Sequence, residues 1–109
     1  MDLKRGRKSL ENKVKEISYA TLQEWQKQQK AIQLVDVRST EERNRFHIGG
    51  IHIPVPLFYE EALLKLSKDI LVVLYCHSGI RSADAGEFLI ENGYTEVYHL
   101  KKGILEIDV

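Results

Sequence analysis

The apolar residues of this chain fall in short clusters that alternate between the spacing of strands and the spacing of helices. Two runs are continuous enough for buried strands, AIQLVDV at 31–37 and ILVVLY at 70–75, and a shorter candidate spans 96–100. Helical spacing appears in the leucines of 57–66 and again over 83–92. Continuous β-branched runs of this kind are typical of parallel strands covered on both faces. The pattern therefore predicts an α/β fold with a mainly parallel sheet.

Two serines predict where helices begin. Ser18 precedes Leu22 and Trp25, which share one helical face, and it predicts a helix that ends near residue 29. Ser39 and Glu42 have the spacing of a capping box, in which each side chain binds the other residue's backbone N–H. The second helix must be short, because two glycines follow within a few residues.

Proline and glycine predict an extended segment and the end of a helix. Prolines stand at 54 and 56, and residues before proline avoid the helical region, so 51–56 is predicted to be extended. Gly93 predicts the end of the helix over 83–92, because glycine readily takes the left-handed conformation that follows a last helical turn.

The N-terminal segment carries a weaker helical pattern and a concentration of charge. Ser9 is a candidate cap, and three apolar residues follow at helical spacing: Leu10, Val14 and Ile17. Residues 1–15 hold six basic and two acidic residues, a net charge of +4 that the rest of the chain offsets. We therefore expect a basic, partly helical extension over 1–15 and one domain over 16–109. A contact with RNA or a membrane surface and a solvated segment without a partner are both open for the extension.

Composition bounds the kind of protein. A chain of 109 residues with 43% apolar residues is the size and type of one globular domain. A formal net charge of zero disfavours a domain devoted to nucleic acid. No secretory signal follows the first residues and the longest apolar run has six residues, which predicts a soluble cytoplasmic protein without a membrane partner. One cysteine excludes an internal disulfide and thiolate-rich metal sites, and we expect no metal or other cofactor.

The single cysteine stands in the loop most suited to chemistry. Cys76 directly follows the strand predicted at 70–75, and ligand sites of open parallel sheets form beyond the carboxyl ends of strands. The following helix start favours a thiolate, the nucleophilic form of the side chain. Gly79 allows the loop to turn its amides inward, and Arg81 adds a cation suited to an anionic substrate. An inert buried cysteine is the alternative, but the composition of the loop favours a nucleophile.

Two motifs in this order resemble the rhodanese-like domain family. The segment CHSGIRSADAGEFLIENGYTEVYHLKKGI at 76–104 resembles the second half of such a domain, with its Cys-x-x-Gly-x-Arg-Ser loop. Upstream, LVDVRSTEERNRFHIGGIHIP at 34–54 resembles the family's Asp-Val-Arg and His-Ile-x-Gly region. The resemblance runs from about residue 17 to 104. It implies a sheet of about five mainly parallel strands, flanked by helices on both faces, with the cysteine loop as active site.

The resemblance implies a sulfurtransferase. Cys76 would take a sulfane sulfur from thiosulfate or a similar small anionic donor, hold it as a persulfide, and pass it to cyanide, a thiol or a protein acceptor. The backbone amides of the loop would bind the donor and stabilise the anion, together with the Arg81 side chain. These loop residues are His77, Ser78, Gly79, Ile80, Arg81 and Ser82.

The polar residues of both motifs receive separate predictions. Arg81 is expected to position the anionic donor, with a salt bridge to an acidic residue as the alternative. His77 is expected to face solvent, although it would favour the thiolate if it faced the sulfur. Ser82 is predicted to cap the following helix. Asp36 and Arg38 are expected to support the site through an ion pair or backbone hydrogen bonds, and Arg38 is a lesser candidate for substrate contact.

Departures from the family pattern leave rival functions open. Lys102-Gly103 stands where the family commonly has two glycines, and no tryptophan follows, so the last helix is predicted to be abbreviated or packed differently. One rival is a non-catalytic module of the same fold that binds or regulates proteins. Another is a cysteine-dependent phosphatase or arsenate reductase. The phosphatase signature places arginine six residues after cysteine, whereas Arg81 is five residues after Cys76.

Overall fold

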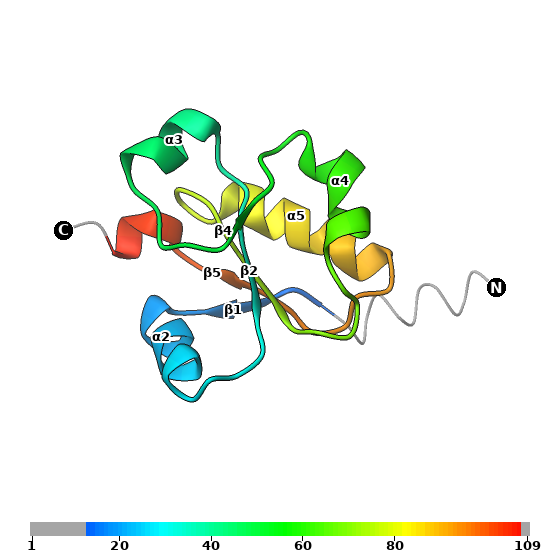
Figure 1. The fold of residues 1–109 in the computed structure, drawn as a ribbon, viewed down its shortest axis with the longest axis horizontal. Coiled ribbons are helices and arrows are strands. Elements are labelled where there is room, and N and C mark those ends of the chain that lie inside the picture. The colour runs from blue at the N-terminus through cyan, green and yellow to red at the C-terminus, as the bar shows by residue number, and fades with distance from the viewer. Residues whose placement is uncertain (1–12, 108–109) are drawn as a thin grey trace.

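A computed structural model describes residues 13–107, and its centre is a sheet of five strands (Figure 1). The order across the sheet is β1-β5-β4-β2-β3, and every neighbouring pair is parallel. The five-stranded parallel sheet expected from the sequence is confirmed. The strands are β1 (Lys15–Ile17), β2 (Gln33–Asp36), β3 (Ile51–His52), β4 (Val72–Tyr75) and β5 (Val97–Leu100).

Helices cover both faces of the sheet. Helix α2 (Tyr19–Lys27) lies on one face, and α4 (Phe58–Lys65) and α5 (Ile80–Glu91) lie on the other (Figure 1). Helix α3 (Thr40–Arg45) follows β2, and a 3-10 helix (Gly103–Glu106) follows β5. The residues of β4 are all buried and alternate between the two apolar layers, as expected for a central parallel strand.

The two helix caps predicted at Ser18 and Ser39 are present. The Ser18 hydroxyl accepts a hydrogen bond from the Thr21 N–H at 3.1 Å, at the start of α2. Ser39 and Glu42 form both hydrogen bonds of the capping box, at 3.1 and 2.9 Å. Gly93 follows Asn92, the cap residue at the end of α5, and has a φ of 95°, the left-handed conformation expected there.

The prediction of a helix reaching Ile17 is wrong over its described part. Lys15–Ile17 is the edge strand β1, paired in parallel with β5, while the start of the predicted helix lies outside the described residues. Val14 packs on Gly86 of α5, where a Cβ atom would approach its side chain to 2.9 Å. Pairing with β5 and this contact outweigh a local helical spacing of apolar residues. The division between an extension and a domain near residue 15 stays a prediction.

The leucine pattern of 57–66 gives the helix correctly but not its buried face. Leu57, Leu63 and Leu64 are exposed, and Leu64 retains 88% of its accessible surface. The buried side chains of this segment are Phe58, Ala62 and Leu66. The larger aromatic side chain of Phe58 therefore decides which side of α4 faces the sheet, in agreement with the large area that aromatic residues bury.

Within the described part of the chain, no helix is long and apolar enough to cross a membrane.

Candidate active site

Cys76 lies at the carboxyl end of the central strand, where three connections of the sheet meet. It follows β4 directly, and α5 begins four residues later at Ile80. Its neighbouring strands β2 and β5 end at the same edge, because the sheet is parallel. The side chain is buried, with 1% of the residue surface exposed. The sulfur therefore sits in an enclosed position that protein groups define.

Three groups of the protein surround the sulfur. The Cys76 Sγ accepts hydrogen bonds from the backbone N–H of Gly79 at 3.1 Å and of Ser82 at 3.3 Å. The Ser82 hydroxyl lies 3.5 Å from the same sulfur. Donors fixed in this way stabilise negative charge on sulfur without reorganisation. They also stand at the amino end of a twelve-residue helix, whose dipole favours an anion.

Two glycines allow the loop to take this shape. Gly79 has a φ of 104°, and a Cβ atom there would lie 2.2 Å from the carbonyl oxygen of Lys101. Gly103 has a φ of 58°, and its Cβ atom would lie 2.4 Å from the carbonyl oxygen of Cys76. Side chains at either position would force the loop and the segment after β5 apart.

The 3-10 helix holds the cysteine loop from the other side. The N–H of Ile104 donates to the Cys76 carbonyl at 2.9 Å, and the N–H of Leu105 donates to the His77 carbonyl at 3.1 Å. The last helix is short, as the departure from the family pattern predicted, and Gly103 is the glycine that packing requires. Lys102 stands where the family commonly has the first of two glycines, and its exposed side chain does not lie between the 3-10 helix and the cysteine loop.

The prediction that Ser82 caps α5 is wrong. The helix begins at Ile80 with Gly79 as its cap residue, so Ser82 lies in the first turn. Its fully buried hydroxyl contacts the Gly79 carbonyl at 3.2 Å and the His99 Nδ1 at 2.9 Å. The Cys76 sulfur accepts the N–H of Ser82 in the first turn of the helix, so that N–H does not need a serine side chain as its partner. The serine instead connects the sulfur to β5.

Arg81 forms the salt bridge that the sequence left as its alternative role. Its two terminal nitrogens donate to the two carboxylate oxygens of Glu42, each at 2.8 Å. The hydrogen bonds from Arg81 lower the pKa of Glu42 to about 2, and the carboxylate raises the pKa of Arg81 in return. The Arg81 side chain keeps 38% of its surface exposed. The pair thus ties the cysteine loop to α3 and leaves an accessible cation beside it.

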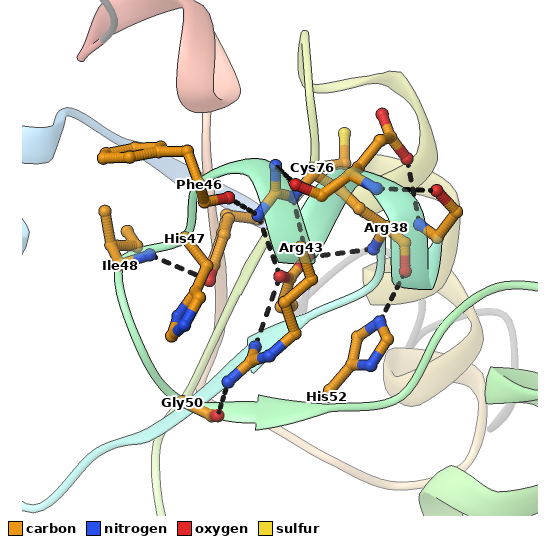
Figure 2. Close-up of polar contacts among 12 residues, drawn as sticks. Arg38, Arg43, Phe46, His47, Ile48, Gly50, His52 and Cys76 are labelled. Atoms are coloured by element: carbon orange, nitrogen blue, oxygen red, sulfur yellow. Dashed lines mark hydrogen bonds and ion pairs between the residues drawn. The ribbon is translucent and has the colours of Figure 1, made fainter.

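Asp36 and Arg38 form the expected ion pair under the loops. The Arg38 Nε donates to the Asp36 Oδ1 at 2.9 Å, and both residues are buried. Arg38 also donates to the Phe46 carbonyl at 2.6 Å, and Arg43 donates to the Gly50 carbonyl at 3.0 Å. Figure 2 shows the side chains of Arg38 and Arg43 between α3 and β3. The pair fixes the connection between β2 and β3 against the site.

A shallow hollow opens beside the loop. Its volume is about 360 Å³, and it is lined by Arg38, Glu42, Arg45, Phe46, His77 and Ile104. His77 is exposed, as predicted, and so are Ser78 and Ile80. The structure thus brings Arg38 and His77 to one opening with Arg45 and Phe46, which sequence reasoning had not assigned to the site. Residues 13–107 contain no cluster of metal-ligating side chains.

His99 is a further residue that the sequence reasoning missed. It lies in β5, retains 4% of its surface, and contacts Ser82 with one ring nitrogen. The other nitrogen, Nε2, lies 3.7 Å from the Glu16 carboxylate. Burial lowers the pKa of His99, and the nearby Glu16 opposes that effect. A histidine near the carboxyl end of a strand next to the cysteine strand is the signal that could have found it.

Comparison with known proteins gives a consistent family. The family model described as a rhodanese-like domain matches residues 18–108. The chain is 37% identical over 86 residues to a probable adenylyltransferase/sulfurtransferase of Mycobacterium tuberculosis, covering 77% of this chain and 22% of that protein. It is 35% identical over 78 residues to the tRNA uridine(34) hydroxylase of Photorhabdus laumondii, covering 66% of this chain and 22% of the relative. The chain thus spans about a fifth of the length of these curated relatives.

A solved structure of similar size shares the fold. The human single-domain sulfurtransferase is 26% identical, with a TM-score of 0.69. The match covers 84% of this chain and 93% of the human chain.

Proposed function

This chain belongs to the rhodanese-like domain family, and we propose that it is a sulfurtransferase that carries sulfane sulfur on Cys76. The observation that supports this most is the sulfur of Cys76, which accepts hydrogen bonds from the N–H groups of Gly79 and Ser82 at 3.1 and 3.3 Å. Such donors suit the thiolate of Cys76, which is the nucleophile of the first step and the leaving group when the persulfide is discharged. The similarity to a human single-domain sulfurtransferase agrees with this activity for a chain of this size.

The proposed reaction has two displacements. The Cys76 thiolate attacks the outer sulfur of thiosulfate, a new S–S bond forms, and the donor's S–S bond breaks with sulfite leaving on the electron pair. A nucleophilic acceptor such as cyanide or a thiolate then attacks the outer sulfur of the persulfide, and Cys76 leaves as the thiolate. Covalent catalysis splits the transfer into two easier steps, and no external oxidant or reductant is needed.

The hollow beside the loop is the proposed entrance for the donor. It is lined by Arg45 and by Arg38, whose guanidinium is buried and paired with Asp36, next to His77, the residue that follows Cys76. Arg81 lies on the α5 side with part of its side chain exposed, and it is paired with Glu42, which also lines the hollow. An anionic donor such as thiosulfate suits these charges, because arginine binds oxyanions through paired N–H donors.

Mass spectrometry tests the proposal. The protein incubated with thiosulfate should gain one sulfur atom, lose it on addition of cyanide, and show no gain in Cys76→Ser. A protein that gains no sulfur from any sulfane donor would overturn the proposal and leave the non-catalytic binding module. Hydrolysis of p-nitrophenyl phosphate that depends on Cys76 would instead support the phosphatase alternative.

A further inference from the structure

Three side chains form a line that runs from the reacting sulfur into the sheet. The Cys76 Sγ lies 3.5 Å from the Ser82 Oγ, and the Ser82 Oγ lies 2.9 Å from the His99 Nδ1. All three residues are buried, with at most 4% of their surfaces exposed. At the far end the His99 Nε2 faces the Glu16 carboxylate at 3.7 Å. A titratable ring is thus connected to the sulfur through one hydroxyl group.

The sheet register places His99 at this point. Glu16 of β1 and Leu74 of β4 are the direct partners of His99 in the two ladders of β5. Side chains that are partners in a parallel ladder project to the same face. Leu74 packs in the apolar layer that also contains residues of α5, the helix that carries Ser82. The α5 face of the sheet therefore brings together Glu16, His99 and Ser82, and Ser82 contacts Cys76.

The donor and acceptor roles along this line follow from the protons that each group carries. The Ser82 hydroxyl has one proton, and its neighbours are the Gly79 carbonyl, the His99 Nδ1 and the Cys76 sulfur. The hydroxyl can donate to the Gly79 carbonyl at 3.2 Å, but that carbonyl also accepts the N–H of Ala83, and the contact with the His99 Nδ1 is shorter, at 2.9 Å. The Glu16 carboxylate favours a proton on Nε2 of His99, which leaves Nδ1 as an acceptor. Ser82 then donates to His99, and its oxygen is free to accept the thiol proton of Cys76.

The charged groups around the ring suit a temporary imidazolium. Glu16 is the carboxylate that faces His99, and its side chain is 52% exposed. Lys101 lies 4.0 Å from the same carboxylate, on its outer side. On the α5 side, Arg81 is next to Ser82, but its guanidinium is paired with Glu42. Burial favours the neutral ring at rest, so His99 is available as a base.

We propose that His99, acting through the Ser82 hydroxyl, receives the proton that Cys76 loses when it becomes a nucleophile. The Cys76 S–H bond breaks and leaves its electron pair on sulfur, a new O–H bond forms on Ser82, and the original hydroxyl proton passes to Nδ1. The products are a thiolate, held by the N–H groups of Gly79 and Ser82, and an imidazolium that faces Glu16. Ser82 contacts the reacting sulfur, and His99 is a positioning residue that supplies the balancing charge. This inference rests on the proposed function of Cys76, but it can be tested without sulfur transfer.

The titration of the thiolate provides the test. Cys76 is the single cysteine of the chain, so the ultraviolet absorbance of the thiolate, measured against the same protein with its cysteine alkylated to subtract tyrosine ionisation, reports this residue alone. We compare the full chain with His99→Asn, whose amide oxygen can still accept the Ser82 hydroxyl but cannot take a proton, and with Ser82→Ala. In both variants the pH midpoint of thiolate formation should rise by about one unit, a tenfold loss of thiolate below the midpoint. The double variant should rise no further than either single variant, because the two residues act in series.

The controls separate a charge effect from a change in structure. His52→Asn is the matched control, because His52 is hydrogen-bonded to the Arg38 carbonyl at 2.7 Å and lies outside the line. It should leave the midpoint unchanged. A folded His99→Asn protein with the parent midpoint would overturn the inference. If His99→Asn unfolds, an unchanged midpoint in Ser82→Ala overturns it equally. Failure of the parent protein to take up sulfur would contradict the proposed function and leave this titration intact.

Discussion

Arg81 and Glu42 join the cysteine loop to α3 through two parallel hydrogen bonds of 2.8 Å, across 39 residues of sequence. The same Glu42 carboxylate accepts the Ser39 N–H of the capping box. One acidic side chain thus holds the start of α3 and the start of α5 together. Its charge matters for stability, and it also sets how free the Arg81 guanidinium is to meet a donor.

The acid stability of the protein should depend on Glu42. Its pKa is about 2 in the folded protein, below the ordinary 4.5, because Arg81 donates to the ionised form. A lowered folded pKa adds stability above the unfolded value, and the contribution is lost as the pH falls from about 4.5 toward 2. Glu42→Gln keeps the capping hydrogen bond but removes the charge, and it should cost about 0.5–1 kcal/mol near pH 7. Urea unfolding at falling pH should show the two proteins converging; a constant difference would contradict this origin.

Arg81 should decide the affinity for anionic donors. If its guanidinium binds thiosulfate, the donor competes with Glu42 for it. Arg81→Ala should raise KM for thiosulfate by roughly tenfold, the range of one charged hydrogen bond, with a smaller effect on an uncharged sulfane donor. Glu42→Gln should lower KM for thiosulfate, because it releases the guanidinium. Equal losses for charged and uncharged donors in Arg81→Ala would show that Arg81 only supports the loop.

The cysteine motif and the strand pattern were readable from the sequence because their chemistry is local. The cysteine motif lies within a dozen residues that include the buried strand, Gly79 and Arg81. A capping box spans only four consecutive residues. The partners of these residues were not readable, because they come from other strands. Glu42 meets Arg81 only after α3 is placed beside α5. Glu16 meets His99 only because β1 pairs with β5 in one particular register.

Local pattern also misled where tertiary pairing was stronger. Val14 and Ile17 have the spacing of residues on one face of a helix. Lys15–Ile17 nevertheless forms a strand, because its backbone pairs with the edge of β5. Ser82 ends the Cys-x-x-Gly-x-Arg-Ser motif, at a place where serine commonly caps a helix, but Gly79 is the cap residue and the Cys76 sulfur accepts the N–H of Ser82. In both cases hydrogen bonds to distant or unusual partners replaced those that the sequence pattern favours.

Tyr75 should determine part of the alkaline stability. It is fully buried, and its hydroxyl donates to the Gly49 carbonyl at 2.8 Å. Burial is the main cause that raises its pKa to about 12. A raised folded pKa gives stability that is complete below the unfolded value near 10 and is lost as the pH rises toward 12. Tyr75→Phe should cost about 1 kcal/mol at neutral pH, since it leaves the half-buried backbone groups of Ile48 and Gly49 without this partner.

Urea unfolding across the alkaline range tests this prediction. Tyr75→Phe should lose less of its remaining stability between about pH 10 and 12 than the parent protein. Tyr98→Phe is the matched control, because the Tyr98 hydroxyl makes an exposed contact with Glu96. Its stability should follow that of the parent. An alkaline loss in Tyr75→Phe equal to that of the parent would contradict the assignment.

Gly103 should be essential for the cysteine loop although it lies outside the motif. A Cβ atom there would lie 2.4 Å from the Cys76 carbonyl oxygen and 2.5 Å from that of His77, both backbone atoms that cannot rotate away. Gly103→Ala should displace the loop, cost at least about 2 kcal/mol in stability and lower kcat/KM for sulfur transfer roughly 10²-fold. Gly49→Ala is the control, because Gly49 also has a positive φ, 95°, but nothing lies within 4 Å of its added carbon. It should cost about 1 kcal/mol from backbone strain and leave kcat/KM unchanged. Equal effects of the two substitutions would mean that strain, and not contact with the loop, makes glycine necessary at 103.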